Sequence, residues 1–417
     1  MRMSKKRTTV LPELQFQEFQ ATGRWSTSKL CLLAERVTLR NQDGSIHRVL
    51  TNSAVDGVVD QADYFDREIV SQSHLKNYYV IDQDDYVYNP RMSISAPVGP
   101  VSKNKLGKGI MSPLYTIFRF KDVNNDFYEQ YFKTSLWHDY IRRKSNTGAR
   151  HDRISISTDD FMNMPLPINA DLNEQQKIAD CLGSVDELID AQAKKLSTLM
   201  QHKNGLMQKL FPAKDRAVAQ LRFAEFSAGS IEFLHGNELF EAVHTKADNC
   251  DLPLLAITQE YGSVPREQIE YRVFVTDKSV EGYKVVEIGD FIISLRSFQG
   301  GIEYSLYRGL CSPAYVVLRK KTDLVNEYYK YYFKTQKFIQ DLNKNLEGIR
   351  DGKIVSYGQF SELLLPKPNK AEQEKVAQVL LSLDTLITEE RKKLDALRIH
   401  KKGLMQKLYP LVEEVCE

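Results

Sequence analysis

A long heptad-patterned stretch occurs twice in this chain of 417 residues. The first copy runs from Asp171 to Pro212 and the second from Asn369 to Pro410. In both copies apolar residues recur in alternating steps of four and three, which is typical of a helix that packs along a partner helix. A helix of about 40 residues is about 60 Å long, so each copy carries an apolar stripe that another element must cover. We expect the other copy to be that element.

The two copies match along their seams, which are the a and d positions of the heptads. The seams are interrupted by polar residues at the same places, Gln192 and Lys203 in the first copy and Glu390 and Lys401 in the second. One such helix by itself is equally typical of a bundle or a dimer interface, whereas two copies indicate an internal repeat. The apolar seam residues are Ile178, Leu182, Val185, Ile189, Leu196, Leu199, Leu206 and Leu210, then Val376, Leu380, Leu383, Ile387, Leu394, Leu397, Leu404 and Leu408.

Both ends of each helix are also marked in the sequence. Each copy opens on an Asx residue with a glutamate three positions later, Asp171 with Glu174 and Asn369 with Glu372, which is the pattern of a capped helix start. Each copy closes on an aromatic residue followed by proline, which cannot continue a helix. The histidines at 202 and 400 lie beside seam lysines, and we expect them on the helix surface.

The segments that precede the two helices align with each other as well. LQFQEF at 14–19 returns as LRFAEF at 221–226, and GIMSPLYTIFRF at 109–120 returns as GLCSPAYVVLRK at 309–320. YVIDQDDYVYNPR at 79–91 is echoed by KVVEIGDFIISLR at 284–296, and YFKT occurs at 131–134 and at 332–335. The chain is therefore a tandem duplication with a repeat of about 200 residues.

Each repeat combines strand and helix signals. The runs DDYVYN, LYTIFRF, DFIIS and AYVVLR are short, rich in β-branched and aromatic residues, and bounded by Gly and Pro, which predicts strands. The stretches at 125–143 and 326–344 carry aromatic residues at helical spacing. A Gly-x-Arg turn at 145–154 and at 345–354 leads to a last strand, and MPLP at 164–167 and LPKP at 365–368 are predicted to be stiff connections into the long helices.

These signals predict an α+β fold with two mixed α/β domains in tandem, each followed by a long α-helix. The two helices are expected to pack as an antiparallel coiled coil. We expect the first domain at 1–168, its helix at 169–212, the second domain at 213–367, and the second helix with a C-terminal tail at 368–417.

Composition excludes little. Lys plus Arg is 57 and Asp plus Glu is 55, so charge neither indicates nor excludes a nucleic-acid partner. The five cysteines are scattered without CxxC spacing, which favours a reducing cytosol without a structural metal. No run of 18 apolar residues is present, so we expect a cytoplasmic protein without a membrane partner.

The sequence carries no catalytic motif that we can identify. GPVSKNKLGKG at 99–109 does not have the glycine spacing of a P-loop, and GxSxG, HExxH and GxGxxG are absent. We therefore expect the chain not to be an enzyme, and an enzyme such as a fused methyltransferase or nuclease ranks last among the alternatives.

Polar and basic residues at strand ends and in loops are the remaining site candidates. Arg and Lys can bind phosphate or guanine, and Gln can pair with adenine. Any one of them is also compatible with an ordinary solvated loop position. The aligned pairs Arg91/Arg296 and Arg150/Arg350 are the best candidates, although a structural role such as pairing with Asp85 and Asp290 stays open. The candidate DNA-binding residues are Arg91, Ser93, Lys103, Lys105, Lys108, Arg150, Arg153, Arg296, Ser297, Gln299, Arg350 and Lys353.

The order of these motifs resembles the specificity (S) subunit of type I restriction-modification systems. The resemblance covers nearly the whole chain and rests on the PLPINADLNEQQKIA helix start, the GLMQKLFP helix end, the SPxY strand and the Gly-x-Arg turn. The resemblance implies two target recognition domains held by conserved spacer helices. The sequence departs from the shared pattern at the Gly-x-Arg turn, where Thr147 precedes the glycine in the first repeat and Glu347 in the second.

The resemblance also implies a function. An S subunit has no catalytic activity or cofactor of its own. It directs two methyltransferase (M) subunits, which use S-adenosylmethionine to methylate adenine, and restriction (R) subunits driven by ATP and Mg. For this chain it implies recognition of a bipartite, asymmetric target in double-stranded DNA. The alternative is a tandem-repeat coiled-coil scaffold for protein interactions without DNA specificity.

Overall fold

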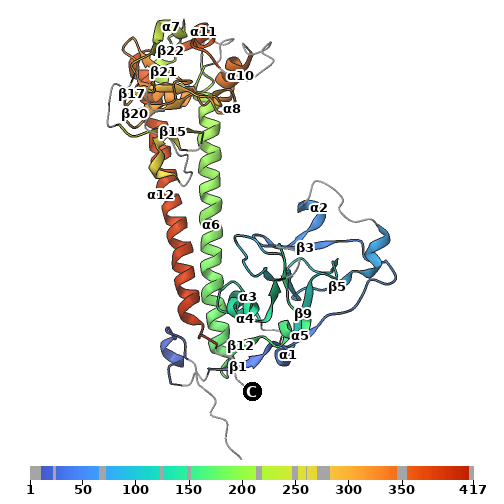
Figure 1. Cartoon of the computed structure of the whole chain (residues 1–417). Helices are drawn as coiled ribbons and strands as arrows, with labels where there is room; N and C mark the ends of the chain where they lie inside the picture. The colour runs from blue at the N-terminus through green and yellow to red at the C-terminus, as the bar shows by residue number, and fades with distance from the viewer. Residues whose placement is uncertain are drawn as a thin grey trace, which may run out of the picture. The chain divides into compact units, whose positions relative to one another are not determined.

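The computed structural model describes residues 11–21, 25–64, 72–122, 125–147, 152–212, 218–246, 252–259, 261–269, 282–344 and 355–412. The chain divides into two compact units (Figure 1). Unit 1 comprises Met1–Gln192 and Lys393–Glu417, and unit 2 comprises Ala193–Lys392. Each long helix therefore contributes one half to each unit.

Unit 1 contains head 1, the part from β1 to β12, whose main sheet has the antiparallel order β2-β9-β6-β7. The predicted strands DDYVYN and LYTIFRF are β6 and β9, at the centre of this sheet. The elements of unit 1 before the long helix are η1 (Gln17–Phe19), β1 (Trp25–Lys29), α1 (Leu30–Leu33), β2 (Ala34–Arg36), β3 (Leu50–Ser53), β4 (Gly57–Asp60), α2 (Gln61–Tyr64), η2 (Gln72–Asn77), β5 (Tyr79–Ile81), β6 (Tyr86–Tyr88), β7 (Val101–Lys103), β8 (Gly109–Met111), β9 (Thr116–Phe120), α3 (Asp126–Phe132), α4 (His138–Lys144), β10 (Asn146–Thr147), β11 (Ile154–Ser155), α5 (Thr158–Met162) and β12 (Pro165–Asn169).

Unit 2 contains head 2, the part from β13 to β22, and its main sheet has the equivalent order β14-β21-β18-β19. The predicted strands DFIIS and AYVVLR are β18 and β21. The elements of unit 2 before the second long helix are η3 (Ala224–Phe226), β13 (Glu232–His235), α7 (Gly236–Leu239), β14 (Phe240–Val243), β15 (Leu255–Thr258), β16 (Gly262–Pro265), η4 (Arg266–Gln268), β17 (Lys284–Val286), β18 (Phe291–Ile293), α8 (Ser297–Gly300), β19 (Glu303–Tyr304), β20 (Gly309–Cys311), β21 (Val316–Lys320), α9 (Asn326–Tyr332), α10 (Gln336–Lys344), α11 (Tyr357–Ser361) and β22 (Leu364–Lys367).

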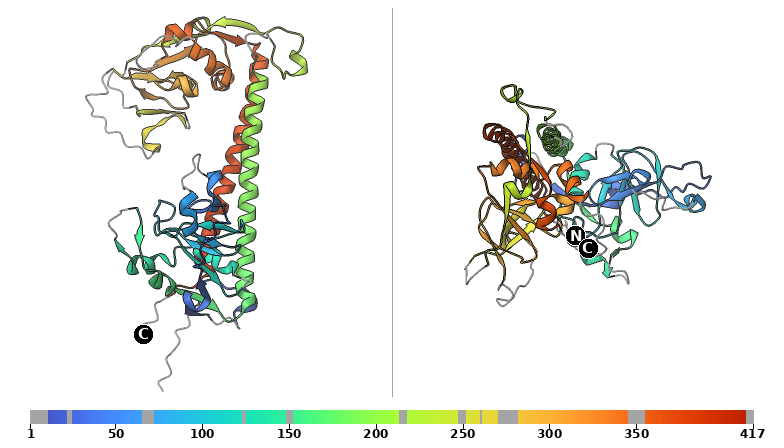
Figure 2. Two further views of the ribbon diagram at one scale, coloured as in Figure 1. Left: turned by 90° about the vertical axis from the view of Figure 1, so that its right-hand side faces the viewer. Right: turned by 90° about the horizontal axis from the view of Figure 1, so that it is seen from above.

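The long helices α6 (Leu172–Leu210) and α12 (Lys370–Leu408) pack against each other in opposite directions. In unit 1 the first half of α6 meets the last half of α12, and in unit 2 the last half of α6 meets the first half of α12. The two helices lie side by side in both views (Figures 1 and 2). All seam residues of both copies are buried or half-buried, whereas His202 and His400 are exposed. The predicted α+β fold and antiparallel helix pair are confirmed.

Each long helix begins near its predicted cap. The side chains of Glu174 and Glu372, however, bind partners other than the backbone N–H of the cap residue that a capping box would use. Asn369 Oδ1 accepts a hydrogen bond from the Glu372 backbone N–H at 2.9 Å, as an N-cap does. The Glu372 carboxylate accepts two hydrogen bonds from Arg222, each at 2.7 Å. In unit 1 the Glu174 carboxylate accepts a hydrogen bond from Gln15 Nε2 at 2.9 Å. The glutamates therefore tie each helix start to the segment that precedes the head of the same unit.

The proline-rich connections into the long helices, which were predicted to be stiff, are β-strands. β12 pairs with β1 and β22 pairs with β13, both antiparallel. Pro165 and Pro167 are two residues apart, so their nitrogens face the same side of β12. Proline has no N–H to donate to a neighbouring strand. It is tolerated in a two-stranded sheet at the positions whose N–H would point away from the partner strand, because only every second residue donates to that strand.

Each head shares its core with both long helices. In unit 1, Tyr409 at the end of α12 donates a hydrogen bond to the Phe127 carbonyl at 2.8 Å, and Ile178 and Leu182 of α6 join the same core. In unit 2, the rings of Phe211 and Tyr328 lie 5.0 Å apart. A large rotation of a head on its helix pair would therefore break the apolar core of that head, since the core includes side chains from both helices.

Candidate nucleic-acid interface

The β6–β7 hairpin of head 1 carries the first group of predicted site residues, and its loop at 89–100 is anchored at the base. Asn89 Nδ2 donates to the Asn52 carbonyl at 2.9 Å, and the Asn89 N–H donates to the Pro100 carbonyl at 3.0 Å. Gly99 has a φ of +82°, and a Cβ there would collide with the Asn89 carbonyl oxygen. Only glycine fits this position, so the loop leaves the sheet along a defined path.

The tip of this loop is a tight turn from Ser93 to Ala96. The Ala96 N–H donates to Ser93 Oγ at 3.1 Å, and the Ser93 N–H donates to the Ala96 carbonyl at 3.0 Å. Ile94 sits within this turn with its side chain fully in solvent, at 105% relative exposure. The predicted site residue Ser93 is therefore exposed, and it holds the turn that presents Ile94.

Arg91 and Arg153 are brought together by a backbone bridge between the loop and the segment before β11. The two residues form an antiparallel β-bridge, and the Met92 N–H donates to the Asp152 carbonyl at 3.0 Å. Arg91 Nε lies 4.0 Å from Asp152 Oδ2, and the Arg91 side chain is 68% exposed. An exposed pair at this distance contributes about 0 to 1 kcal/mol, so the guanidinium of Arg91 can exchange Asp152 for a phosphate or a base.

The lysines after the hairpin differ in their surroundings. The Lys103 side chain is only 6% exposed, and its Nζ lies 2.6 Å from Asp126 Oδ1 and 3.1 Å from Asp84 Oδ1. Burial alone would lower the pKa of Lys103, but the hydrogen bonds to both carboxylates outweigh it and raise the pKa. Lys105 and Lys108 are exposed, and Lys105 Nζ is 2.8 Å from a Glu129 oxygen. The charge of Lys103 is thus compensated within head 1.

The β18–β19 hairpin of head 2 has a different loop, at 294–302, which forms the short helix α8. Ser297 is 1% exposed, and its Oγ accepts a hydrogen bond from the Ser294 N–H at 2.9 Å. Arg296 and Gln299 are exposed. The structure therefore gives Ser297 a part in forming the turn, and it leaves Arg296 and Gln299 facing solvent.

The α8 loop is held from outside by side chains that donate to its backbone. Asn343 Nδ2 donates to the Phe298 carbonyl at 2.7 Å, Lys334 Nζ to the Gly300 carbonyl at 3.0 Å, and Gln259 Nε2 to the Arg296 carbonyl at 3.2 Å. Lys334 also pairs with Glu303, which is buried, at 2.5 Å. The two hairpin loops are thus both ordered by internal hydrogen bonds, but they reach different shapes.

Three of the predicted site residues cannot be placed. Arg150, Arg350 and Lys353 lie outside the described residues, as do the Gly-x-Arg turns that contain these two arginines. The assignment of all twelve candidates to DNA contacts remains a prediction.

The possible structural pairing of Arg91 and Arg296 with Asp85 and Asp290 is corrected, because other arginines occupy those carboxylates. Arg119 Nε and Nη2 donate to the two oxygens of Asp85 at 2.6 and 2.9 Å. Arg319 donates to Asp290 in the same way at 2.8 and 2.6 Å.

Sequence reasoning missed these arginine–aspartate pairs, although a signal for them was present. Arg119 and Arg319 occupy the same place in the aligned segments 109–120 and 309–320. The aspartates are almost fully buried, with side-chain exposures of 0% and 3%. A cation at matching positions in both repeats predicted a partner but not which one, because each aspartate directly precedes the neighbouring strand of the sheet, β6 or β18.

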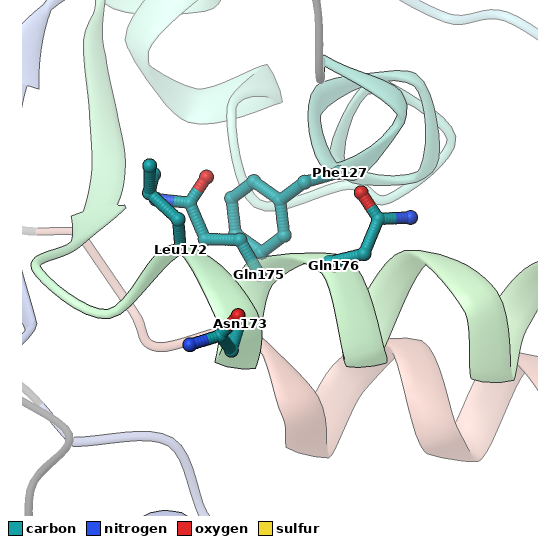
Figure 3. A pocket seen from close by; sticks show the side chains of 5 residues that line it. All are labelled: Phe127, Leu172, Asn173, Gln175 and Gln176. Atoms are coloured by element: carbon teal, nitrogen blue, oxygen red, sulfur yellow. The ribbon is translucent and has the colours of Figure 1, made fainter.

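A pocket of about 140 Å³ lies between α3 and the start of α6 (Figure 3). It is lined by Phe127, Leu172, Asn173, Gln175 and Gln176. Gln175 Nε2 donates a hydrogen bond to the Asn169 carbonyl at 3.0 Å. The lining contains no ionisable side chain and none of the predicted site residues, so the pocket does not extend the candidate interface.

The described part of the chain offers little for other kinds of site. Among the described residues, no group of three or more His, Cys, Asp or Glu side chains is placed to hold a metal ion. Within the same residues, no helix is both long enough and apolar enough to span a bilayer. Cys31, Cys181 and Cys311 are free thiols.

The fold is that of type I S subunits. An S subunit crystal structure from M. genitalium matches with a TM-score of 0.55 at 14% identity, covering 97% of this chain and all of that chain. A structure described as the basis of complex assembly and conformational transition of the type I R-M system matches with a TM-score of 0.57 at 13% identity, covering 93% of this chain and 97% of that chain.

Sequence relatives point to the same class, although no family model matches. The putative type I restriction enzyme MjaX specificity subunit of Methanocaldococcus jannaschii is 23% identical over 67% of this chain. The type I restriction enzyme MjaVIII specificity subunit of the same organism is 24% identical over 72% of this chain. This chain spans 65% of the first relative's length and 73% of the second's. The resemblance to type I specificity subunits that the motifs indicated is confirmed.

Proposed function

We propose that this chain is the DNA sequence-recognition subunit of a type I restriction-modification enzyme. The observation that carries the proposal is the contrast within the duplication. The two heads share one sheet order and one way of joining the long helices, but they present unlike hairpin loops at equivalent places. The relatives named above are specificity subunits, which supports the same assignment.

The duplication suits a split DNA target. The chain is a duplicated sequence whose two long helices run in opposite directions, and a duplex has local two-fold axes of its own. Such a protein can read two half-sites in opposite orientation, about one helical turn or somewhat more apart. Because the loops at 89–100 and 294–302 differ, the half-sites differ and the target is asymmetric. The DNA between them is not read.

The proposed interface consists of exposed basic and amide side chains of the candidate set together with the half-buried Arg153. Arg91 and Arg153 serve the first half-site, and Arg296 and Gln299 serve the second. Lys105 and Lys108 add positive charge beside the first hairpin. Lys103 and Ser297 support the loops from inside their heads, because each is engaged by groups of its own head. We keep 1–168 and 213–367 as the proposed recognition domains, with 169–212 and 368–417 as the spacer helices and tail.

The partners follow from the same proposal. Two M subunits with S-adenosylmethionine methylate adenine, and R subunits with ATP and Mg carry out restriction, so this chain contributes neither catalysis nor a cofactor. The complex acts in the cytoplasm, where its DNA is. The formal net charge is only +2, and binding by phosphate neutralisation alone requires many free cations. We therefore expect the isolated chain to bind DNA weakly and the M subunits to supply much of the affinity.

Methylome sequencing tests this function directly. The chain is co-expressed with an adenine methyltransferase (M) subunit from the same genome, and genomic adenine methylation is mapped with and without this chain. We expect methylation at one split, asymmetric sequence only when the chain is present. Equal methylation in its absence would refute the proposal and favour a protein-interaction scaffold.

A further inference from the structure

One aspartate in each unit joins three elements. In unit 1, Asp186 of α6 accepts from Lys401 Nζ of α12 at 2.5 Å through Oδ1. Its other oxygen accepts from Gln130 Nε2 at 3.1 Å and from Lys133 Nζ at 3.2 Å. Gln130 belongs to α3 and Lys133 follows it directly, so a single carboxylate links both long helices to head 1.

Unit 2 repeats the arrangement with the helices exchanged. Asp384 of α12 accepts from Lys203 Nζ of α6 at 2.5 Å through Oδ1, and from Tyr331 Oη of α9 at 2.6 Å through Oδ2. Asp186 and Asp384 occupy the same position of the duplicated helix, as do the seam lysines. Gln130 and Tyr331 are also equivalent, because each directly precedes YFKT in its repeat. The same junction has therefore been built twice from the duplicated sequence.

Both ion pairs are partly shielded from solvent. The Lys401 and Lys203 side chains are 10% and 19% exposed, and the aspartates are about one third exposed. Burial would raise the pKa of Asp186, but the hydrogen bond from Lys401 and the charge of Lys133 outweigh it and lower the pKa. Burial raises the pKa of Tyr331, and its bond to Asp384 raises it further, so the hydroxyl keeps the proton that it donates.

A polar pair in an apolar seam restricts the register of two helices. Leucine seams tolerate alternative registers, whereas a largely buried lysine needs a carboxylate within hydrogen-bonding distance, and the alignment seen here provides one. Because the second oxygen of that carboxylate binds the head, the same alignment also determines how the head stands on the helix pair.

Orientation matters for a protein that reads two separated half-sites. One base pair more in the gap rotates the second half-site by about 35°, since a turn contains about 10 to 10.5 base pairs. If a head can change its orientation on the helix pair, the protein can bind targets with several gap lengths. If the orientation of the head is fixed, the protein binds targets with one gap length.

We propose that Asp186 and Asp384 are positioning residues for DNA recognition, which set the gap between the half-sites by holding each head on the helix pair. This inference rests on the proposed function. It predicts that cutting the bond between head and aspartate broadens the range of accepted gaps without changing the half-site sequences.

Tyr331→Phe is the sharpest test, because it removes only the hydroxyl that reaches Asp384 and leaves the Lys203 pair in place. Tyr329→Phe is the matched control. It removes a buried hydroxyl of the same helix, which donates to the Pro366 carbonyl at 2.9 Å inside the head. In unit 1, Asp186→Asn is tested against Asp190→Asn, one turn further along α6 at an exposed position.

The assay is methylation of a plasmid library in cells that contain the full chain and its methyltransferase partner. The library carries the two mapped half-sites with gaps that vary by single base pairs. For Tyr331→Phe and Asp186→Asn we expect methylation at gaps one base pair off the preferred length to rise roughly fivefold relative to the preferred gap, the equivalent of one lost hydrogen bond. The two controls should keep the wild-type gap profile.

Three outcomes decide the matter. A broadened profile only in Tyr331→Phe and Asp186→Asn supports the inference. An unchanged profile, with methylation lowered at all gaps alike, overturns it and leaves the aspartates a role in stability. Broadening by the controls as well overturns it too. Failure of the proposed function is distinguishable, because the wild-type chain would then show no sequence-dependent methylation at any gap.

Discussion

The two units are alike where each head meets the long helices and unlike at the hairpin loops 89–100 and 294–302. On the helix-facing side the contacts repeat. The Leu14 N–H donates to the Lys407 carbonyl, and the Leu221 N–H donates to the Lys209 carbonyl, both at 2.9 Å. Lys177 pairs with Glu18 and lies 5.1 Å from the ring of Phe16, and the residues at the equivalent positions of unit 2 make the same two contacts.

The hairpin side diverges in both shape and chemistry. The loop at 89–100 presents an isoleucine from a serine turn, whereas the loop at 294–302 forms α8 and presents a glutamine. Arg91 and Arg296 end the aligned segments, and the residue three positions later is Ile94 in the first loop and Gln299 in the second. The scaffold is therefore duplicated and the presented side chains are not, which is the division of labour expected of two reading domains with different targets.

The largest expected effect on stability distinguishes Arg222 from Gln15, which occupy equivalent positions in the two repeats next to the long helices. Arg222→Met should destabilise the chain by about 3 to 5 kcal/mol, because it leaves the Glu372 carboxylate buried without its cation. Gln15→Met at the equivalent position should cost about 1.5 kcal/mol, since only a neutral donor to Glu174 is lost. Urea unfolding of the full chain measures both. Equal losses would contradict the distinction between the two units.

The second prediction concerns a contact that both units share. Arg119→Met and Arg319→Met should each lower stability by about 2 to 3 kcal/mol, because a buried aspartate loses a bidentate partner while keeping one backbone N–H donor. The surface pair of Arg48 and Asp60 is the control, and Arg48→Met should cost less than about 1 kcal/mol. Thermal or urea unfolding decides it. A small loss in either head would show that the duplicated contact no longer has the same importance.

The third prediction uses DNA binding to test the divergent side. Arg296→Ala should weaken binding through the second half-site only, by roughly 1 to 3 kcal/mol if the guanidinium contacts a base. Competition binding with the methyltransferase complex measures it on the full target and on DNA in which the second half-site is scrambled. An equal loss on both DNAs would make Arg296 a phosphate-binding or folding residue.

The smallest expected effect concerns the unlike side chains Ile94 and Gln299, each three residues after the aligned arginine of its repeat. If Ile94 packs against a thymine methyl group, deoxyuridine in place of that thymine should weaken binding of the first half-site by about 1 kcal/mol. Ile94→Ser should show the same loss on thymine-containing DNA and no further loss with deoxyuridine. Gln299→Ala serves as the control, since it should leave the first half-site unaffected. An equal deoxyuridine effect in wild type and Ile94→Ser would exclude the methyl contact.

Much of the fold could be predicted because its signals are local and repeated. The heptad seams, the Asx starts and the aromatic-proline ends indicated both long helices, and the seam residues are buried or half-buried as expected. The strands at the centre of both main sheets were also predicted, since β-branched and aromatic runs between Gly and Pro carry that preference locally. For the site, the sequence indicated which side chains could bind DNA, and their role in binding is still a prediction.

Only the tertiary structure decided which polar side chains form hydrogen bonds or ion pairs within the protein. Lys103 looked like a free cation, yet two carboxylates surround it, and Ser297 is buried beneath its turn. Asp186 and Lys401 are 215 residues apart in sequence and hydrogen-bonded in the structure. Periodicity reports only the face on which a side chain lies, because it depends on near neighbours in the chain. The partner of a charged group depends on which distant segments the packed helices and strands bring within hydrogen-bonding distance.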